Sequence, residues 1–214
     1  MKSGAIPATK ISAIITDLGG VIIAVDKRPL CAELAKHSAL SAEELLSNFS
    51  STKLTKFDLS FGKGLITPEE FYEASVAKLK LSGISFAEFA KVYSRVFKRK
   101  EDCIALLRRL SEKHTLALLS NTDALHYESW SKLLGKDMNL FKEVVLSFRV
   151  HAAKPQPQIY LEAARRLGLE PQRCIYIDDV QEYADAATKV GMHGTHFVSA
   201  QQLKSDLEKL GVKA

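Results

Sequence analysis

Five short apolar runs rich in β-branched residues alternate with helical patterns, and this alternation constrains the fold most strongly. The predicted strands are Ser12 to Thr16, Thr115 to Leu119, Val144 to Ser147, Cys174 to Ile177 and Thr195 to Val198. Such runs are typical of strands buried on both faces of a parallel sheet. The predicted helices between the last four strands are Ala124 to Leu134, Gln158 to Leu167 and Val180 to Val190, each followed by a glycine C-cap signal. Because parallel strands need crossover connections, we expect an α/β fold, a doubly wound, Rossmann-like parallel sheet with helices on both faces.

The stretch from residue 26 to residue 96 interrupts this alternation, with no convincing strand after Val21 to Val25. Three segments inside it fit the capping box, in which a Ser or Thr at the N-cap pairs with a Glu three residues later. These boxes begin at Ser41, Thr67 and Ser85. We therefore predict a helical domain at residues 26–96, inserted into an α/β core made of residues 1–25 and 97–214.

The composition is that of a globular protein and excludes several classes. The chain has 214 residues, of which 46% are hydrophobic, so it can bury a full core. Polar residues and glycines interrupt the apolar runs at the N-terminus, which is unlike a signal peptide, and no segment approaches the ~20 apolar residues of a membrane span. The three cysteines lack metal-ligand spacing and fit a reducing compartment. We expect a cytoplasmic protein with no membrane partner.

The net charge of +5 is compatible with nucleic acid as a partner, so the distribution of the basic residues matters. The one dense cluster comprises Lys91, Arg95, Lys98, Arg99 and Lys100. We interpret it as a solvated face at the end of an amphipathic helix whose apolar stripe covers residues 86–97, because no nucleic-acid motif accompanies it. The expected protein has no nucleic-acid partner and is a monomer or a homodimer.

Polar residues suited to phosphate chemistry follow four of the five predicted strands. In chain order they are Asp17, then Ser120 with Asn121 and Thr122, then Lys154 with Pro155, and finally Asp178 with Asp179. Taken singly, Ser120 is most often a helix cap and Lys154 a solvated surface lysine. In an open α/β sheet, however, ligands bind beyond the carboxyl ends of the strands, where these residues would converge.

Each of these residue types has a role in phosphoryl transfer. Asp17 can attack phosphorus as a carboxylate nucleophile, and Asp17 with Asp179 supplies the oxygen ligands that Mg²⁺ prefers. Ser120, Asn121 and the backbone amides that open the next helix can bind phosphate oxygens of the substrate. Lys154, held extended by the following proline, can bind phosphate and neutralise the charge that develops during transfer. The sequence therefore predicts a Mg²⁺-dependent phosphoryl-transfer site.

The order of these residues resembles that of the haloacid dehalogenase superfamily over nearly the whole chain. The four motifs of that superfamily are matched by TDLGGVI, LALLSNT, AAKPQPQIY and IYIDDVQEYADAA. The resemblance implies a Rossmann-like core, with Asp17 as the catalytic nucleophile and with Ser120 and Lys154 as catalytic phosphate ligands.

The resemblance also implies a metal site and a cap. Mg²⁺ would be held by Asp17, the backbone carbonyl of Gly19 and Asp179, with Asp178 supporting these ligands from behind or through water. The helical insertion corresponds to the cap that lies between the first and second motifs in one branch of the superfamily. Such caps close over the substrate and select it.

Gly19 departs from the pattern of the superfamily's phosphatases, most of which carry a second Asp there that protonates the leaving group and activates water. General acid and base assistance contributes about 10² to 10⁴ in rate. One hypothesis is a leaving group that needs little help, as in the sugar-1-phosphate phosphatases of bacteria, whose first motif is similar. A second is a replacement acid, with Asp26 as the first candidate and His126 and His151 as weaker ones. The third is a protein that binds a phosphometabolite or a partner without turnover.

Dehalogenases of the superfamily also lack the second acid, because a halide leaves without a proton, so a 2-haloacid dehalogenase is the rival activity. Those enzymes work without metal and do not place two carboxylates at the fourth motif, where this chain has Asp178 and Asp179. A second departure is Tyr183, where related enzymes often carry Asn or Asp near the metal. We expect a Mg²⁺-dependent phosphatase that acts on a small phosphorylated metabolite, such as a sugar phosphate, through an aspartyl-phosphate intermediate on Asp17.

Overall fold

A five-stranded sheet forms the centre of the computed structural model, which describes residues 10–49 and 55–213. Every neighbouring pair of strands is parallel, and the order is β5-β4-β1-β6-β7. The strands are β1 (Ala13–Thr16), β4 (Thr115–Ser120), β5 (Phe141–Leu146), β6 (Cys174–Asp178) and β7 (His193–His196). The predicted doubly wound α/β fold is confirmed. Because β1 lies between β4 and β6, the carboxyl ends of these three strands meet at one edge of the sheet.

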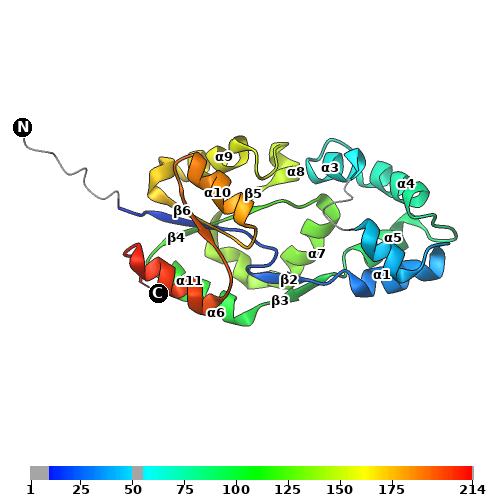
Figure 1. The fold of residues 1–214 in the computed structure, drawn as a ribbon, viewed down its shortest axis with the longest axis horizontal. Helices are drawn as coiled ribbons and strands as arrows, with labels where there is room; N and C mark the ends of the chain where they lie inside the picture. The colour runs from blue at the N-terminus through cyan, green and yellow to red at the C-terminus, as the bar shows by residue number, and fades with distance from the viewer. Residues whose placement is uncertain (1–9, 50–54, 214) are drawn as a thin grey trace, which may run out of the picture.

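Helices cover both faces of this sheet, as Figure 1 shows. They are α6 (Glu101–Ser111), α7 (Ala124–Leu134) and α11 (Ala200–Lys209) on one face, and α9 (Pro157–Leu167) and α10 (Gln181–Lys189) on the other. Alternate residues of β1 point to opposite layers, as the pleat of a strand requires. Ile14 packs in the cluster that contains Leu107 of α6, whereas Ala13 and Ile15 pack in the cluster that contains Ile159 of α9.

A group of helices between β2 and β3, at the right of Figure 1, has its own apolar core. Its α-helices in the described residues are α1 (Arg28–Leu34), α2 (Ala42–Asn48), α3 (Lys56–Gly62), α4 (Pro68–Lys78) and α5 (Phe86–Tyr93). The capping boxes at Ser41, Thr67 and Ser85 are present as predicted. Thr55 caps α3 through a fourth box, with an Asp in place of the usual Glu. These local caps fix where the helices begin.

Short helical segments complete the connections. They are η1 (Ala35–His37), η3 (Gly135–Leu140), α8 (Ser147–Val150) and η4 (Pro171–Arg173). α8 follows β5 directly and leads the chain toward Lys154. None of the helices in the described part of the chain is long and apolar enough to cross a membrane.

A two-stranded antiparallel ribbon links the helical group to the sheet. β2 (Ile23–Val25) pairs with β3 (Phe97–Arg99), and Ala24 lies opposite Lys98. The expected amphipathic helix over residues 86–97 is therefore wrong at its C-terminal end, because α5 ends at Tyr93. Pairing with β2 requires extended backbone at this point, so the ladder of hydrogen bonds overrides the helical periodicity of the side chains.

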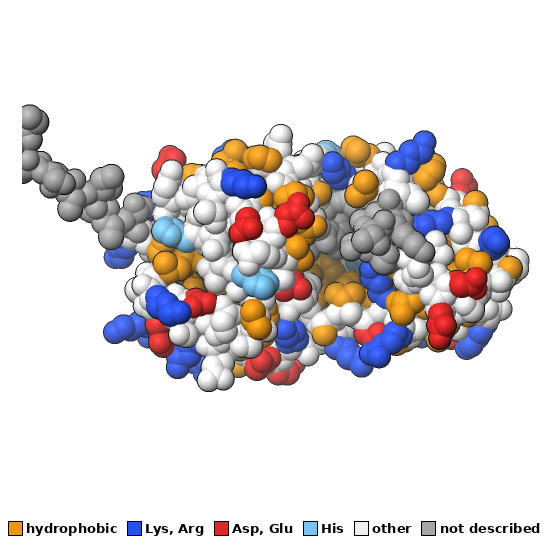
Figure 2. All heavy atoms as spheres, in the orientation of Figure 1, with side chains coloured by type: hydrophobic (Ala, Val, Ile, Leu, Met, Phe, Trp, Pro, Cys, Tyr) orange, Lys and Arg blue, Asp and Glu red, His pale blue; other side chains and the backbone are white. Residues whose placement is uncertain are grey.

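The basic cluster is likewise not one solvated helix face. Lys91 and Arg95 are exposed, but Arg99 binds Asp137, with 2.7 Å between Nη2 and Oδ2. Lys100 Nζ donates to the carbonyl oxygen of Gly20 at 2.6 Å. Basic and acidic side chains mix over the face of the molecule drawn in Figure 2. The residues of this cluster therefore do not form one basic surface: some are exposed, and others bind different partners within the fold.

Asp137 links β3 to α6, because it binds one arginine from each of these elements. Its carboxylate accepts hydrogen bonds from Arg99 and from Arg108, the latter at 2.8 Å from Nε to Oδ1. Burial by itself raises the pKa of Asp137, but the hydrogen bonds from Arg99 and Arg108 outweigh it and hold the pKa below its ordinary value of 3.8. The ionised form is therefore favoured in the folded protein.

We expect Asp137→Asn to lower the free energy of unfolding by about 1–3 kcal/mol near neutral pH, because it weakens two charge-assisted hydrogen bonds. A carboxylate with a lowered pKa stabilises the fold above the pKa of the unfolded state and loses this contribution as the pH falls through its folded pKa. Urea unfolding of both proteins at pH 7 and pH 3 should show a smaller deficit at pH 3. An equal deficit at both pH values would show that the charge is not the cause.

Candidate active site

The edge of the sheet where β1, β4 and β6 end brings together the predicted nucleophile and its partners. Lys154 Nζ lies 2.8 Å from Asp17 Oδ1 and 2.7 Å from Asp178 Oδ2. All three side chains are buried, and Asp178 is completely inaccessible. The structure therefore places Asp17, Lys154 and Asp178 in one contact network, although 161 positions separate the two aspartates in the sequence.

Asp179 adds a third carboxylate, which leaves the cluster with more negative than positive charge. One oxygen each of Asp17, Asp178 and Asp179 lies within 4.8 Å of the others. Burial raises the pKa of Asp17 from 3.8 to about 6; Lys154 lowers this pKa and Asp178 raises it further. Burial, and then the neighbouring Asp178, also raise the pKa of Asp179. A set of crowded carboxylate oxygens fits a hard divalent cation such as Mg²⁺.

The two glycines of the first motif have different structural requirements. Gly20 has φ +75°, and a Cβ built on it would lie 1.9 Å from Asp179 Oδ2. Only glycine allows the backbone to pass so close to that carboxylate. A Cβ on Gly19 would meet only Val25 Cγ2, at the ordinary contact distance of 3.7 Å. The backbone therefore needs glycine at the second position and not at the first; the predicted metal contact of the Gly19 carbonyl stays a prediction.

Asp178 is held by three hydrogen-bond donors. The Lys154 ammonium and the Tyr176 hydroxyl both donate to Oδ2, and the backbone N–H of Val180 donates to Oδ1 at 2.9 Å. Burial raises the pKa of Tyr176, so its hydroxyl remains protonated. Tyr176 is not among the site residues predicted from the sequence. The available signal was its spacing, because residues two apart on a strand point to the same face.

Lys154 also lies against two aromatic rings. Its Nζ is 5.0 Å from the ring centroid of Tyr183 and 5.8 Å from that of Tyr176. The departure at Tyr183 thus replaces a polar side chain by a ring face that attracts the ammonium. Of the three N–H bonds of the ammonium, two are accounted for by Asp17 and Asp178 within the described residues. The third can serve a substrate oxygen.

Asn121 fixes the backbone of Lys154. Asn121 Nδ2 donates to the Lys154 carbonyl at 3.1 Å, and the Lys154 N–H donates to Asn121 Oδ1 at 2.9 Å. Both Nδ2 and Oδ1 of Asn121 are used in this pairing. If Asn121 contacts the substrate as predicted, its backbone N–H is the donor. Ser120 is buried at the end of β4, as predicted.

The helix after Ser120 has the predicted bounds. α7 begins at Ala124 with Asp123 as its N-cap, so three residues separate Ser120 from the helix. The N–H of Thr122 donates to Ser147 Oγ at 2.9 Å and is not free for phosphate. Ser147 Oγ also contacts the carbonyl of Gly62 in the helical group at 2.6 Å. No pattern in the sequence distinguishes Ser147 from other serines.

Asp26 is unsuited to the role of replacement acid. It forms an ion pair with Arg28 at 2.9 Å. Hydrogen bonds from Arg28 lower the pKa of Asp26 from 3.8 to about 2. A carboxyl group with this pKa is ionised near neutral pH, so its ion pair with Arg28 argues against Asp26 as the acid.

The two histidine candidates are engaged elsewhere in the structure. His126 Nδ1 lies 2.7 Å from Asp123 Oδ2, and its Nε2 lies 3.2 Å from the carbonyl oxygen of Tyr93. His151 is exposed, with Nδ1 at 2.8 Å from the carbonyl oxygen of Lys63. His126 can therefore transfer a proton only if one of these two contacts breaks. A role for either histidine as the acid stays a prediction.

A cavity of about 280 Å³ lies between the helical group and the strand ends. Its walls on the core side include Asn121 and Ala153, the sequence neighbours of Ser120 and Lys154. The helical group contributes four aromatic side chains, namely Phe49, Phe61, Phe71 and Tyr93. Charged and polar side chains, among them Asp58, Asp123 and His126, line the same cavity. Phosphate chemistry at Lys154 would therefore take place next to a small hollow with both aromatic and polar walls.

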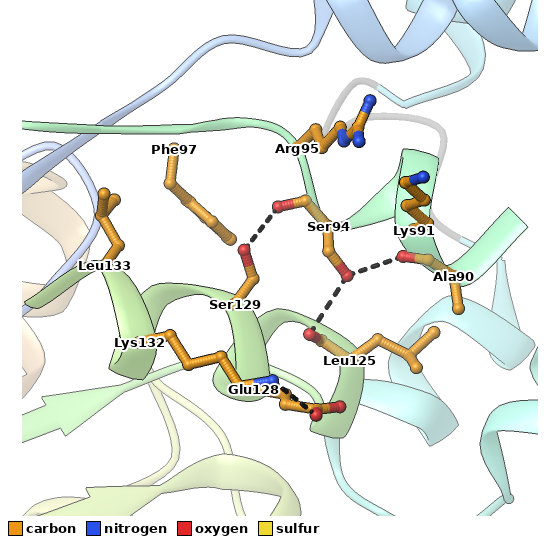
Figure 3. Close-up of a pocket in the computed structure, with 10 residues that line it drawn as sticks. All are labelled: Ala90, Lys91, Ser94, Arg95, Phe97, Leu125, Glu128, Ser129, Lys132 and Leu133. Atoms are coloured by element: carbon orange, nitrogen blue, oxygen red, sulfur yellow. Dashed lines mark hydrogen bonds and ion pairs between the residues drawn. The ribbon is translucent and has the colours of Figure 1, made fainter. Parts of the chain in front are cut away.

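A larger groove, of about 730 Å³, lies between α5 and α7 and is drawn in Figure 3. Ser129 Oγ donates to the Ser94 carbonyl at 2.8 Å across this groove. At its rim Lys132 pairs with Glu128 at 2.9 Å. None of the ten residues drawn is a predicted site residue, so size alone does not identify the functional site.

Comparison with known proteins identifies the family to which these features correspond. Residues 11–191 match the family model of haloacid dehalogenase-like hydrolases. A glyceraldehyde 3-phosphate phosphatase of Methanopyrus kandleri is 28% identical over 152 residues, which cover 70% of this chain and 61% of the relative. The aligned region thus spans about three fifths of the length of that relative.

Two solved structures resemble the fold. A family enzyme from Bacteroides thetaiotaomicron, solved with magnesium and inorganic phosphate, has a TM-score of 0.75 and 25% identity, and covers 87% of this chain and 93% of that one. The L-2-haloacid dehalogenase from Xanthobacter autotrophicus has a TM-score of 0.66 and 18% identity, with coverages of 95% and 85%. The second likeness is one of fold alone.

Proposed function

The chain belongs to the haloacid dehalogenase-like hydrolase family, and we propose that it is a Mg²⁺-dependent phosphatase that acts on a small phosphorylated metabolite. The buried network of Asp17, Lys154 and Asp178 carries this proposal, because it sets a carboxylate nucleophile beside a fixed ammonium. The phosphatase relative and the family structure with bound magnesium and phosphate support it.

In the proposed reaction, a carboxylate oxygen of Asp17 attacks phosphorus, and the bond from phosphorus to the ester oxygen breaks. The leaving oxygen takes a proton from solvent. Water then hydrolyses the aspartyl phosphate, which releases inorganic phosphate and restores the carboxylate. Lys154 donates its third N–H to a phosphate oxygen and offsets the charge that develops during both steps. Ser120 and the backbone N–H of Asn121 bind further phosphate oxygens.

Asp17, Asp179 and the carbonyl of Gly19 would hold Mg²⁺, and the crowding of three carboxylates around one ammonium fits a divalent ion. When bound, the ion supplies positive charge that lets the phosphate approach a carboxylate and polarises the phosphoryl oxygens. Asp178, whose oxygens already accept three hydrogen bonds, would support these ligands from behind.

We propose that residues 26–96 act as a cap and that the leaving group occupies the 280 Å³ cavity beneath it. This volume lies near the lower limit of about 300 Å³ that is typical of ligand pockets, which favours a small substrate. Because Gly19 has no side chain to protonate the leaving group, sugar-1-phosphates and acyl phosphates are the favoured substrates. Their leaving groups depart with little general-acid assistance.

The proposed location is a reducing cytoplasm. Cys31, Cys103 and Cys174 support it, since all three are free thiols buried in the fold. A monomeric or homodimeric state, without a nucleic-acid or membrane partner, belongs to the same proposal.

Phosphate release from a panel of substrates tests the proposed function. The panel contains sugar-1-phosphates, glyceraldehyde 3-phosphate, acetyl phosphate and p-nitrophenyl phosphate, each with Mg²⁺ and with a chelator. We expect Mg²⁺-dependent release that is fastest for the substrates with good leaving groups. Metal-independent chloride release from 2-haloacids would instead identify a dehalogenase. Tight phosphometabolite binding with no release from the whole panel would identify a binding protein.

A further inference from the structure

Two buried tyrosines lie side by side behind the site, and only one of them touches it. Tyr176 and Tyr160 are both fully buried, and their rings meet edge to face with centroids 5.1 Å apart. The Tyr176 hydroxyl donates to Asp178 Oδ2. The Tyr160 hydroxyl donates instead to the backbone carbonyl of Tyr183 at 3.0 Å. The two side chains are both inaccessible to solvent, but their hydroxyls have different hydrogen-bond acceptors.

The oxygen that Tyr176 contacts is the one that also binds Lys154. Asp178 Oδ2 accepts both donors, and the same ammonium lies 2.8 Å from Asp17 Oδ1. Asp17 and Asp178 thus share a single cation, and all three side chains are buried. A hydrogen bond from the Tyr176 hydroxyl stabilises the negative charge of Asp178 and makes the local potential less negative. Asp178 then attracts the ammonium less strongly. The ammonium can then remain between Asp17 and an incoming phosphate.

We propose that Tyr176 is a positioning residue that favours phosphate binding by holding Asp178, so that Lys154 stays available to Asp17 and the substrate. This inference rests on the proposed phosphatase site, because it assigns the phosphate contact to Lys154. The tyrosine hydroxyl touches neither the phosphate nor the metal and acts through the carboxylate. Its effect has a definite sign: it strengthens the binding of an anion and does not strengthen the binding of a cation.

Calorimetric titrations of wild type, Tyr176→Phe and Tyr160→Phe test this sign. Mg²⁺ is titrated without phosphate, and inorganic phosphate is then titrated at saturating Mg²⁺. For Tyr176→Phe we expect phosphate affinity to fall by about three- to tenfold, because one hydrogen bond to a charged group is lost. The Mg²⁺ affinity of this variant should be unchanged or higher, because the Asp178 carboxylate loses a hydrogen-bond donor and makes the site more negative. Tyr160→Phe should change neither affinity by more than about twofold.

Comparing the affinities for Mg²⁺ and for phosphate distinguishes a positioning role of Tyr176 from a general disruption of the site. A parallel loss of Mg²⁺ and phosphate affinity in Tyr176→Phe would overturn the proposal, and so would equal effects in the two variants. Wild-type protein that binds both ligands but releases no phosphate from the substrate panel would refute the phosphatase function. The comparison of the two tyrosines would still decide the role of Tyr176.

Discussion

Asp17→Asn should abolish phosphate release, with a fall in rate on the order of 10⁴ to 10⁶. The amide keeps the shape of the side chain but is not a nucleophile, so the aspartyl phosphate cannot form. The variant should nevertheless fold, because Lys154 retains its contact with Asp178 at 2.7 Å. Measurement of phosphate release with saturating Mg²⁺ and the best substrate of the panel gives the result directly.

Two controls separate chemistry from folding in this experiment. Asp185→Asn removes an exposed carboxylate of α10 outside the site and should leave the rate unchanged. Burial raises the pKa of Asp17 to about 6, so its charge destabilises the metal-free fold increasingly as the pH rises from about 4 through 6. In chelator at pH 7.5, Asp17→Asn should therefore unfold at the same temperature as wild type or higher. Residual metal-dependent turnover above about a hundredth of the wild-type rate would rule out Asp17 as the nucleophile.

The parallel core was predictable because its central strands are buried on both faces and so are continuously apolar. The edge strands were placed less well. β5 begins at Phe141, three residues before the predicted start, because Lys142 and Glu143 lie on an edge where polar side chains reach solvent. β7 begins at His193 instead of Thr195. Its Gly194 packs so close to α10 that a Cβ would lie 2.0 Å from the Ala184 carbonyl, a constraint invisible in the sequence.

The ends of the strands were predictable for a geometric reason, and the details around them were not. Parallel strands end at one edge of a sheet, so Asp17, Ser120 and Asp178 had to lie near one another. The hydrogen bonds between the Asn121 side chain and the Lys154 backbone join two loops that are 33 positions apart in the sequence. The periodicity of the sequence does not encode such a contact. Capping signals were enough to predict helices within residues 26–96, but the contact of this group through Ser147 required the three-dimensional structure.

The contrast between the two glycines of the first motif makes the missing acid testable. Gly20 is required by its positive φ and by the approach to Asp179, so its presence carries no information about mechanism. Gly19 is free of both constraints, since a Cβ at this position would meet only Val25, at 3.7 Å. Glycine at position 19 is therefore a chemical departure that the fold does not demand.

Gly19→Asp should raise the rate on substrates with poor leaving groups, such as glyceraldehyde 3-phosphate, by about 10² and at most 10⁴. The added carboxyl group can give its proton to the ester oxygen and later take one from water. Acetyl phosphate, whose leaving group needs no proton, should be hydrolysed at nearly the wild-type rate. Gly19→Asn is the matched control, because it has the same shape but no proton to transfer. Equal rates for the two variants on every substrate would mean that leaving-group protonation does not limit the rate. The substrate preference would then depend on the cavity between the helical group and the strand ends.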